Sequence, residues 1–201
     1  MKTTTERWNE NWSIYRENAP WESNAVDNSL ISYINATVGI KTALELGCGS
    51  GINSVWLAQQ GFDVTAIDVA DLAIDLTINT SDLNNVDIKT TTCDILEYNT
   101  LEKYDFIFDR GCYHNYSNFE QQTNFVKKVS SLLSPTGTWL SIIGSDDRTD
   151  DDGPPKHKLL SIVNCFDPWL DILEIQKCKI LMYNNLSSPA WKVVSKNKTK
   201  E

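Results

Sequence analysis

The chain has 201 residues, with 18 Lys and Arg against 27 Asp and Glu, so its formal net charge is −9. This length suits one hydrophobic core rather than two independent domains. The negative charge disfavours nucleic acid as a partner, because phosphate is repelled over most of the surface. Five cysteines without Cys-x-x-Cys spacing, no apolar stretch after Met1 and no apolar run of roughly 20 residues predict a cytoplasmic protein that has reduced thiols and no membrane partner.

Short apolar runs alternate with segments of helical period from about residue 25 onward. This alternation is typical of β–α units around a parallel sheet. The predicted strands cover residues 42–46, 63–68, 86–92, 104–109, 138–143, 172–182 and 190–195. The last two are close in sequence, which favours a hairpin. We therefore predict an α/β fold with a Rossmann-like, seven-stranded, mostly parallel sheet, helices on both faces and an antiparallel C-terminal edge hairpin.

Helices are predicted between the strands from apolar residues at helical spacing. Ser117-Asn118-Phe119-Glu120 is a capping box that begins one of them, and Pro135 and Gly137 are expected to end it. Another helix is expected near residues 156–166, just before the C-terminal hairpin.

A glycine-rich sequence follows the first predicted strand, and it reads Glu45-Leu46-Gly47-Cys48-Gly49-Ser50-Gly51. Its three glycines leave the backbone open to an approaching ligand. Asp68 ends the next strand, where a carboxylate is placed opposite the two hydroxyls of a ribose. Asp94 and Ile95 follow the third strand, on the rim where an adenine could stack and form hydrogen bonds. These positions predict a cofactor that contains a nucleoside.

The kind of cofactor is inferred from charge. The pyrophosphate of a dinucleotide favours Gly-x-Gly-x-x-Gly at a helix N-terminus. This chain has Gly-x-Gly-x-Gly, and the carboxylate of Glu45 comes just before it. A negative charge there suits the sulfonium cation of S-adenosyl-L-methionine better than a diphosphate, so we predict a methyltransferase rather than a dehydrogenase. The alternative is that Glu45 and Asp68 only cap or solvate strand ends.

Three further motifs occur in order along the chain, and they are Trp8-x-x-x-Trp12 followed by Pro20-Trp21, Asp109-Arg110-Gly111, and Gly153-Pro154-Pro155. Together with the glycine loop they resemble the class I methyltransferases, and within them the thiopurine, thiol, halide and tellurite methyltransferase group. The resemblance implies a small-molecule acceptor. It also implies that Trp8 and Trp12 belong to a segment that covers the cofactor.

Residues 1–24, called the leader below, precede the β–α pattern and carry Trp8, Trp12, Tyr15 and Trp21. As a lid, these rings could stack on adenosine or face the sulfonium through cation–π attraction. Alternatively, the rings could have a structural role and attach the leader to the core by packing against it. The resemblance favours the lid, and the methyltransferase domain itself is expected over residues 25–201.

The fourth predicted strand is followed by the candidate catalytic residues. Asp109 is expected beside the cofactor and the reaction centre, because open α/β sheets bind ligands at the carboxyl ends of their strands. Arg110 could hold an anionic acceptor, or it could form an internal ion pair with Asp109. His114 could act as a general base for an oxygen or nitrogen acceptor, or as a hydrogen-bonded structural residue. His157, flanked by two lysines, is expected to face solvent.

The aspartates between Asp146 and Asp152 could indicate a metal site. A run of this kind without an ordered ligand pattern is usually a solvated loop, so we expect no metal.

The predicted activity is methyl transfer to a soft nucleophile such as a thiol, thiopurine, selenide, tellurite or halide. The first alternative is an oxygen or nitrogen methyltransferase of another small metabolite. The second is a noncatalytic module that binds S-adenosylmethionine. Either a monomer or a homodimer is compatible with the sequence.

Overall fold

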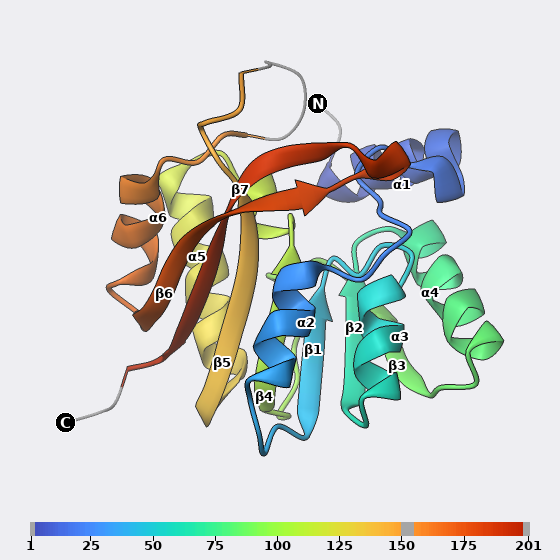
Figure 1. Cartoon of the computed structure of the whole chain (residues 1–201), viewed down its shortest axis with the longest axis horizontal. Helices are drawn as coiled ribbons and strands as arrows, with labels where there is room; N and C mark the ends of the chain where they lie inside the picture. The colour runs from blue at the N-terminus through green and yellow to red at the C-terminus, as the bar shows by residue number, and fades with distance from the viewer. Residues whose placement is uncertain (1–2, 150–154, 199–201) are drawn as a thin grey trace.

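The computed structural model describes residues 3–149 and 155–198. They form a seven-stranded sheet in the order β3-β2-β1-β4-β5-β7-β6 (Figure 1). Strands β1 to β5 are parallel to one another, and β7 is antiparallel to both β5 and β6. The strands are β1 (Thr42–Leu46), β2 (Asp63–Asp68), β3 (Ile88–Thr92), β4 (Tyr104–Arg110), β5 (Leu133–Gly144), β6 (Leu170–Leu181) and β7 (Ser187–Asn197).

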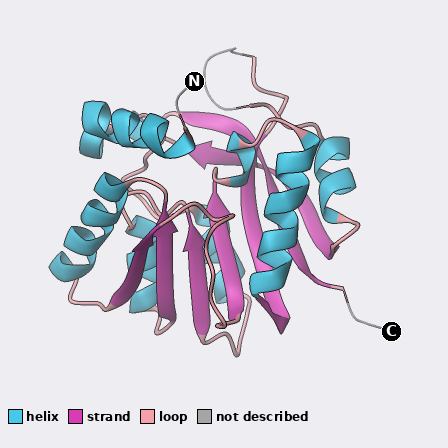
Figure 2. Cartoon of the chain, turned by 180° about the vertical axis from the view of Figure 1, so that it is seen from behind, coloured by secondary structure: helices cyan, strands magenta, loops and turns pink. Residues whose placement is uncertain are grey.

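Helices cover both faces of this sheet, as Figures 1 and 2 show from opposite sides. The α-helices are α1 (Thr4–Tyr15), α2 (Asn28–Asn35), α3 (Ile52–Gln59), α4 (Asp71–Leu83), α5 (Phe119–Leu132) and α6 (Leu159–Phe166). Short 3-10 turns are η1 (Arg16–Asn18), η2 (Tyr113–Asn115) and η3 (Tyr183–Asn185). The predicted α/β fold, with its parallel sheet and antiparallel edge hairpin, is therefore confirmed. None of the described helices is long and apolar enough to cross a membrane.

The central strands β1 and β4 are buried on both faces. Ala43 packs in the cluster beneath α2 and α3, and its neighbour Leu44 packs in the cluster beneath α5 and α6. Successive side chains of a strand point to opposite faces of the sheet, so a strand that is covered twice has no polar face. This arrangement explains the unbroken apolar run from Phe106 to Phe108.

Two local predictions were wrong. The N-cap of α5 is Asn118, whose side chain accepts the Gln121 N–H, so the predicted capping box does not form. Helix α5 ends at Leu132 and β5 begins at once, before Pro135 and Gly137. Leu133 pairs with Tyr104, and Thr138 pairs with Phe106, so an irregularity in the register between these pairs accommodates the proline and the glycine.

The leader lies at one end of the sheet. Helix α1 lies above the carboxyl ends of β1 and β2 and packs against α4 (Figure 1). Because the parallel strands all end on this side, the loops that follow them and the leader enclose a common space.

Aromatic side chains dominate the core beneath α5 and α6. Trp139 of β5 stacks on Phe166 with 4.6 Å between the ring centroids. Its indole Nε1 donates to the carboxylate of Asp109, at 3.0 Å. The polar end of this buried ring is therefore satisfied inside the core.

Replacing Trp139 with Phe should lower the free energy of unfolding by about 1–3 kcal/mol, because a buried carboxylate loses one of its donors. Urea unfolding followed by circular dichroism measures the change. Trp169→Phe is the matched control, because Trp169 is partly exposed, and it should change stability by less than about 0.5 kcal/mol. Equal losses for the two variants would contradict a stabilising role for the Trp139–Asp109 hydrogen bond.

Candidate active site

The glycine loop joins β1 to α3 and is held against β2. The N–H groups of Gly47 and Cys48 both donate to the Ile67 carbonyl, at 2.8 and 3.1 Å. Gly51 is the N-cap of α3 and has a φ of 81°, in the left-handed region that favours glycine. A Cβ at Gly51 would lie 2.9 Å from the Thr77 Cα, so any other residue would push α4 away from the loop.

Asp68 ends β2 and faces the glycine loop. One of its carboxylate oxygens accepts the Gly49 N–H at 3.1 Å, and the other accepts the Ala70 N–H at 2.9 Å. Burial raises the pKa of this carboxyl group. Each carboxylate oxygen has a second lone pair, so Asp68 can still accept hydrogen bonds from a ligand.

Glu45 is almost fully buried in β1. Its carboxylate accepts hydrogen bonds from the Asn53 amide, at 3.2 Å, and from the Ser54 hydroxyl. Burial raises the pKa of Glu45 to about 8. The side chain therefore carries a proton at neutral pH when no cation is near.

Glu22 is a site residue that the sequence analysis did not identify. Its carboxylate accepts a hydrogen bond from the Ser50 hydroxyl, and a Cβ on Gly49 would clash with Glu22 Oε1. Burial raises the pKa of Glu22 as well. The one local signal is its place beside Trp21 in the leader, since nothing in the spacing links residue 22 to the glycine loop.

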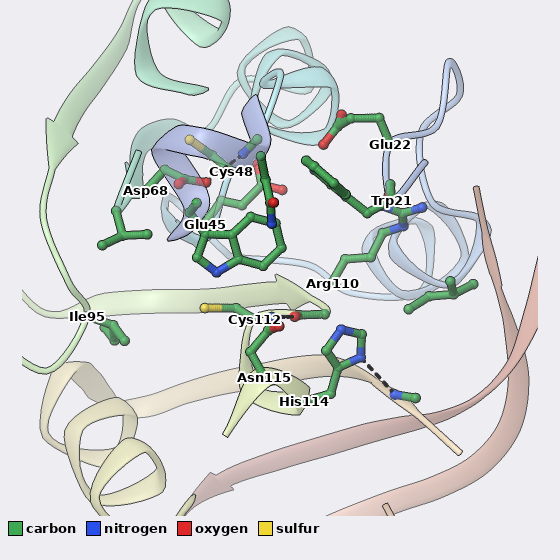
Figure 3. A pocket seen from close by; sticks show the side chains of 18 of the residues that line it. Trp21, Glu22, Glu45, Cys48, Asp68, Ile95, Arg110, Cys112, His114 and Asn115 are labelled. Carbon is green, nitrogen blue, oxygen red and sulfur yellow. Dashed lines mark hydrogen bonds between the residues drawn. The ribbon is translucent and has the colours of Figure 1, made fainter. Parts of the chain in front are cut away.

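These groups line one cavity of about 750 Å³ at the carboxyl ends of the strands (Figure 3). Asp68 and Glu45 lie toward one end of it, and Arg110 and His114 lie toward the other. The predicted cofactor-binding residues that line the cavity are Trp8, Trp12, Glu45, Gly47, Gly49, Asp68, Asp94 and Ile95. Gly51 and Asp109 are not part of its lining.

The leader contributes aromatic rings to the wall of the cavity. Trp21 is in edge-on contact with Trp8, Trp12 and Tyr15, at centroid distances of 5.1, 5.4 and 5.5 Å. Trp12 is only 2% exposed and packs with alanines at the start of α4. The same rings that line the cavity therefore also attach the leader to the domain.

Arg110 connects the leader to the C-terminal hairpin. Its guanidinium donates to the carbonyls of Trp21 and Leu181. Its Nε lies 3.5 Å from a carboxylate oxygen of Asp27, whose side chain is almost fully buried. Arg110 is thus paired with Asp27 rather than with its neighbour Asp109, although it also lines the cavity.

Asp109 lies behind the cavity wall and is fully buried. Its carboxylate accepts the N–H groups of Cys112 and Tyr113, both at 3.0 Å, in addition to the Trp139 indole. Burial raises the pKa of Asp109 to about 6. These bonds hold the turn that carries Arg110 and His114 to the cavity.

His114 lines the cavity and is neutral. Its Nδ1 accepts the Gly144 N–H at 3.1 Å, so the ring proton is on Nε2. Burial lowers the pKa of His114 to about 3, and the nearby charges of Arg148 and Arg110 lower it further in the same direction. The free ring edge faces the cavity as a hydrogen-bond donor (Figure 3).

The prediction that His157 faces solvent was wrong, because its side chain is 3% exposed. Backbone bonds with Gly144 and Asp146 place residue 157 alongside the end of β5, and its Nε2 lies 3.0 Å from the His114 carbonyl. The Trp191 indole donates a hydrogen bond to the His157 carbonyl.

A second arginine, Arg148, also lines the cavity and was not singled out from the sequence. It follows β5 in the acidic loop. Among the described residues, no group of three or more His, Cys, Asp or Glu side chains could hold a metal. Asp150 to Asp152 and the first two residues of the Gly-Pro-Pro motif lie outside the described residues.

The sheet order, the glycine loop and the carboxylate at the end of β2 define a Rossmann-like α/β protein, a class that binds its ligands at the carboxyl ends of the strands. The family model of thiopurine S-methyltransferase matches residues 3–163. Because the match covers most of the chain, this protein belongs to the thiopurine S-methyltransferase family.

Two curated methyltransferases are similar to parts of the chain. A probable S-adenosyl-L-methionine-dependent methyltransferase, TehB of Haemophilus influenzae, is 32% identical over 108 residues, which are 54% of this chain and 37% of TehB. A ubiquinone biosynthesis O-methyltransferase of Rickettsia bellii is 26% identical over 144 residues, 71% of this chain and 58% of that protein. The matches thus span less than two thirds of either relative.

The fold is also that of N-methyltransferase NodS from Bradyrhizobium japonicum, solved in complex with S-adenosyl-L-homocysteine. The TM-score is 0.79 at 18% identity, over 98% of this chain and 100% of NodS. At that identity the likeness concerns the fold.

The buried carboxyl of Glu45 predicts a pH dependence of stability. Its pKa is about 8 in the folded protein and ordinary in the unfolded chain, so the folded state holds the proton more tightly. Raising the pH from 6.5 to 8 should therefore lower the free energy of unfolding of the cofactor-free protein by about 1–2 kcal/mol. Burial also raises the pKa values of Glu22 and Asp68, so these carboxyl groups act in the same direction, whereas Asp109 and His114 contribute mainly below this range.

Urea unfolding of the wild type and of Glu45→Gln, at several pH values, measures this effect. The variant keeps the volume and the polar contacts of the side chain but has no proton to lose, so its stability should fall less steeply with rising pH than that of the wild type. The same slope in both proteins would show that another group is responsible.

Proposed function

We propose that this protein transfers the methyl group of S-adenosyl-L-methionine to a small-molecule acceptor that has a soft nucleophilic atom, such as a thiol, a thiopurine, a selenide, tellurite or a halide. The observation that supports it best is the cavity in which the glycine loop and Asp68 meet the aromatic leader. Membership of the thiopurine S-methyltransferase family supports the same class of acceptor.

The chemistry of the cavity wall fits this cofactor. Asp68 offers carboxylate lone pairs to the ribose hydroxyls, and Asp94 with Ile95 offers an acceptor and an apolar surface to the adenine. The carboxyl group of Glu45 suits a positively charged ligand. We therefore assign cofactor binding to these residues together with Gly47, Gly49, Trp8 and Trp12.

Bound in this cavity, S-adenosylmethionine supplies an electrophilic methyl group on a positively charged sulfur. The residues of this chain supply orientation and exclude water. Asp109 orients the turn after β4, which brings Arg110 and His114 to the acceptor. The leader acts as a lid over the cavity of the methyltransferase domain, which comprises residues 25–201. Its tryptophans keep water from the reacting atoms.

A soft nucleophile needs little help with proton removal. A thiol is partly ionised near neutral pH, and a halide has no proton to lose. His114 is poorly suited to be a base, because its Nδ1 already accepts a hydrogen bond and its pKa is about 3. Arg110 remains the proposed cation for an anionic acceptor, although its bonds to the leader equally support a role as an anchor.

The first alternative is an oxygen or nitrogen acceptor, which the name of the Rickettsia bellii relative favours. A turnover screen of thiols, halides, selenite and phenols with labelled cofactor distinguishes it from the leading proposal. Absence of turnover with every acceptor, alongside binding of the cofactor, would support a noncatalytic module. We further propose a cytoplasmic monomer or homodimer that has no nucleic-acid partner.

Asp68→Asn should weaken the binding of S-adenosylmethionine by roughly 10- to 100-fold, because hydrogen bonds from the ribose to a charged acceptor are lost. Isothermal calorimetry measures the affinity, and thermal unfolding checks that the variant is folded. Asp63→Asn changes the other, exposed end of β2 and should leave the affinity unchanged. Wild-type protein that binds a nicotinamide dinucleotide but neither S-adenosylmethionine nor its demethylated product would refute the proposed function.

His114→Gln should lower turnover of a thiol by less than about 10-fold and leave the shape of the pH profile unchanged, because a glutamine oxygen can accept the Gly144 N–H. Arg110→Met should instead raise the Michaelis constant more than the His114 change does. Steady-state kinetics against pH compares the two variants. A loss of roughly 10²- to 10⁴-fold for His114→Gln, with Arg110→Met near normal, would favour the oxygen or nitrogen alternative.

A further inference from the structure

The leader contributes a partly buried carboxylate, that of Glu22, to the wall of the cavity. Glu22 packs against the glycine loop, where the missing Cβ of Gly49 leaves room for its Oε1. The Ser50 hydroxyl donates to the other carboxylate oxygen and fixes its direction. Trp12 lies beside the same point of the loop. Glu22 is thus placed in the cavity wall rather than in solvent.

A carboxylate in this position needs a positive partner. Burial raises the pKa of Glu22, and the neighbouring carboxylate of Asp68 raises it further. Arg110 is the nearby cation that opposes this effect, but its guanidinium is bound to Asp27 and to two carbonyls. Buried charges are stable when they are paired, so this end of the cavity is complementary to a ligand that carries a cation.

The order of contacts along the loop indicates which part of the ligand meets Glu22. Gly49 donates its N–H to Asp68, the proposed ribose ligand, and the next residue, Ser50, donates to Glu22. Asp94 and Ile95, the proposed adenine contacts, follow β3 at the edge of the sheet. Glu22 therefore lies on the methionine side of the ribose, and that part of the cofactor carries an ammonium group.

We propose that Glu22 is a cofactor-binding residue supplied by the leader, and that its carboxylate accepts hydrogen bonds from the ammonium group of the methionine part. The inference rests on the proposed function, and it gives the leader a polar role in addition to its aromatic cover. Binding of the ammonium group then holds the leader closed, because Glu22 and the tryptophans belong to the same segment.

Calorimetry with two probes tests this assignment. S-adenosylhomocysteine has the ammonium group, whereas 5′-methylthioadenosine keeps the adenosine and the sulfur but lacks the amino acid part. Glu22→Gln should weaken S-adenosylhomocysteine by roughly 10- to 100-fold, the value of a hydrogen bond between charged groups, and should change 5′-methylthioadenosine by less than about 3-fold. The decisive readout is the dissociation constant of S-adenosylhomocysteine divided by that of 5′-methylthioadenosine.

Glu174→Gln is the matched control, because it removes the same charge from an exposed position on β6 and should leave the ratio unchanged. Glu22→Asp keeps the charge but draws it back from the loop, so it should raise the ratio of the S-adenosylhomocysteine dissociation constant to that of 5′-methylthioadenosine by less than Glu22→Gln does. This second variant decides the question if Glu22→Gln does not fold.

Equal weakening of both probes by the Glu22 variants would overturn the inference, because Glu22 would then only hold the leader in place. An unchanged affinity for S-adenosylhomocysteine would overturn it as well. In both cases wild-type binding of S-adenosylhomocysteine would leave the proposed function intact. Failure of the wild type to bind either probe would refute the proposed function itself.

Discussion

The hydrogen bond from the Gly49 N–H to the carboxylate of Asp68 joins the parts on which the cavity depends. Gly49 belongs to the loop between β1 and α3, whereas Asp68 ends β2, so this bond ties two neighbouring strand ends together. The loop comes this close because Gly49 and Gly51 adopt positive φ angles and have no Cβ. A carboxylate that is already held by backbone N–H groups loses little freedom when a ligand binds, which favours affinity.

The elements of the fold were largely predictable, because each depends on a local pattern of apolar residues. The start of β5 was not, since it depends on pairing between Leu133 and Tyr104, which are far apart in sequence. The N-cap of α5 was placed one residue too early for a different reason. Ser117 and Asn118 are both good caps, and only the path of the chain after η2 decides between them.

Some residues of the candidate site could likewise be predicted from the sequence, and others could not. Spacing along the chain identified the glycine loop, Asp68, Asp94 and Ile95, because each follows a strand of the same parallel sheet and therefore ends at the same edge. Glu22 was missed because its partner Ser50 belongs to a distant segment. The sequence around His157 was misleading. Two lysines flank it, which suggested exposure, but its backbone pairs with the end of β5 and its side chain is buried.

The Asp-Arg-Gly motif shows how three adjacent residues can serve three different contacts. Asp109 is satisfied by two backbone N–H groups and an indole, so it needs no guanidinium partner. Arg110 is consequently available to reach Asp27 and the leader. Gly111 has a φ of 87°, and a Cβ there would lie 2.9 Å from the ring of His114. The aspartate thus holds the turn, the arginine holds the leader, and the glycine makes room for the histidine. A change at any one of the three would therefore disturb the cavity through a different contact.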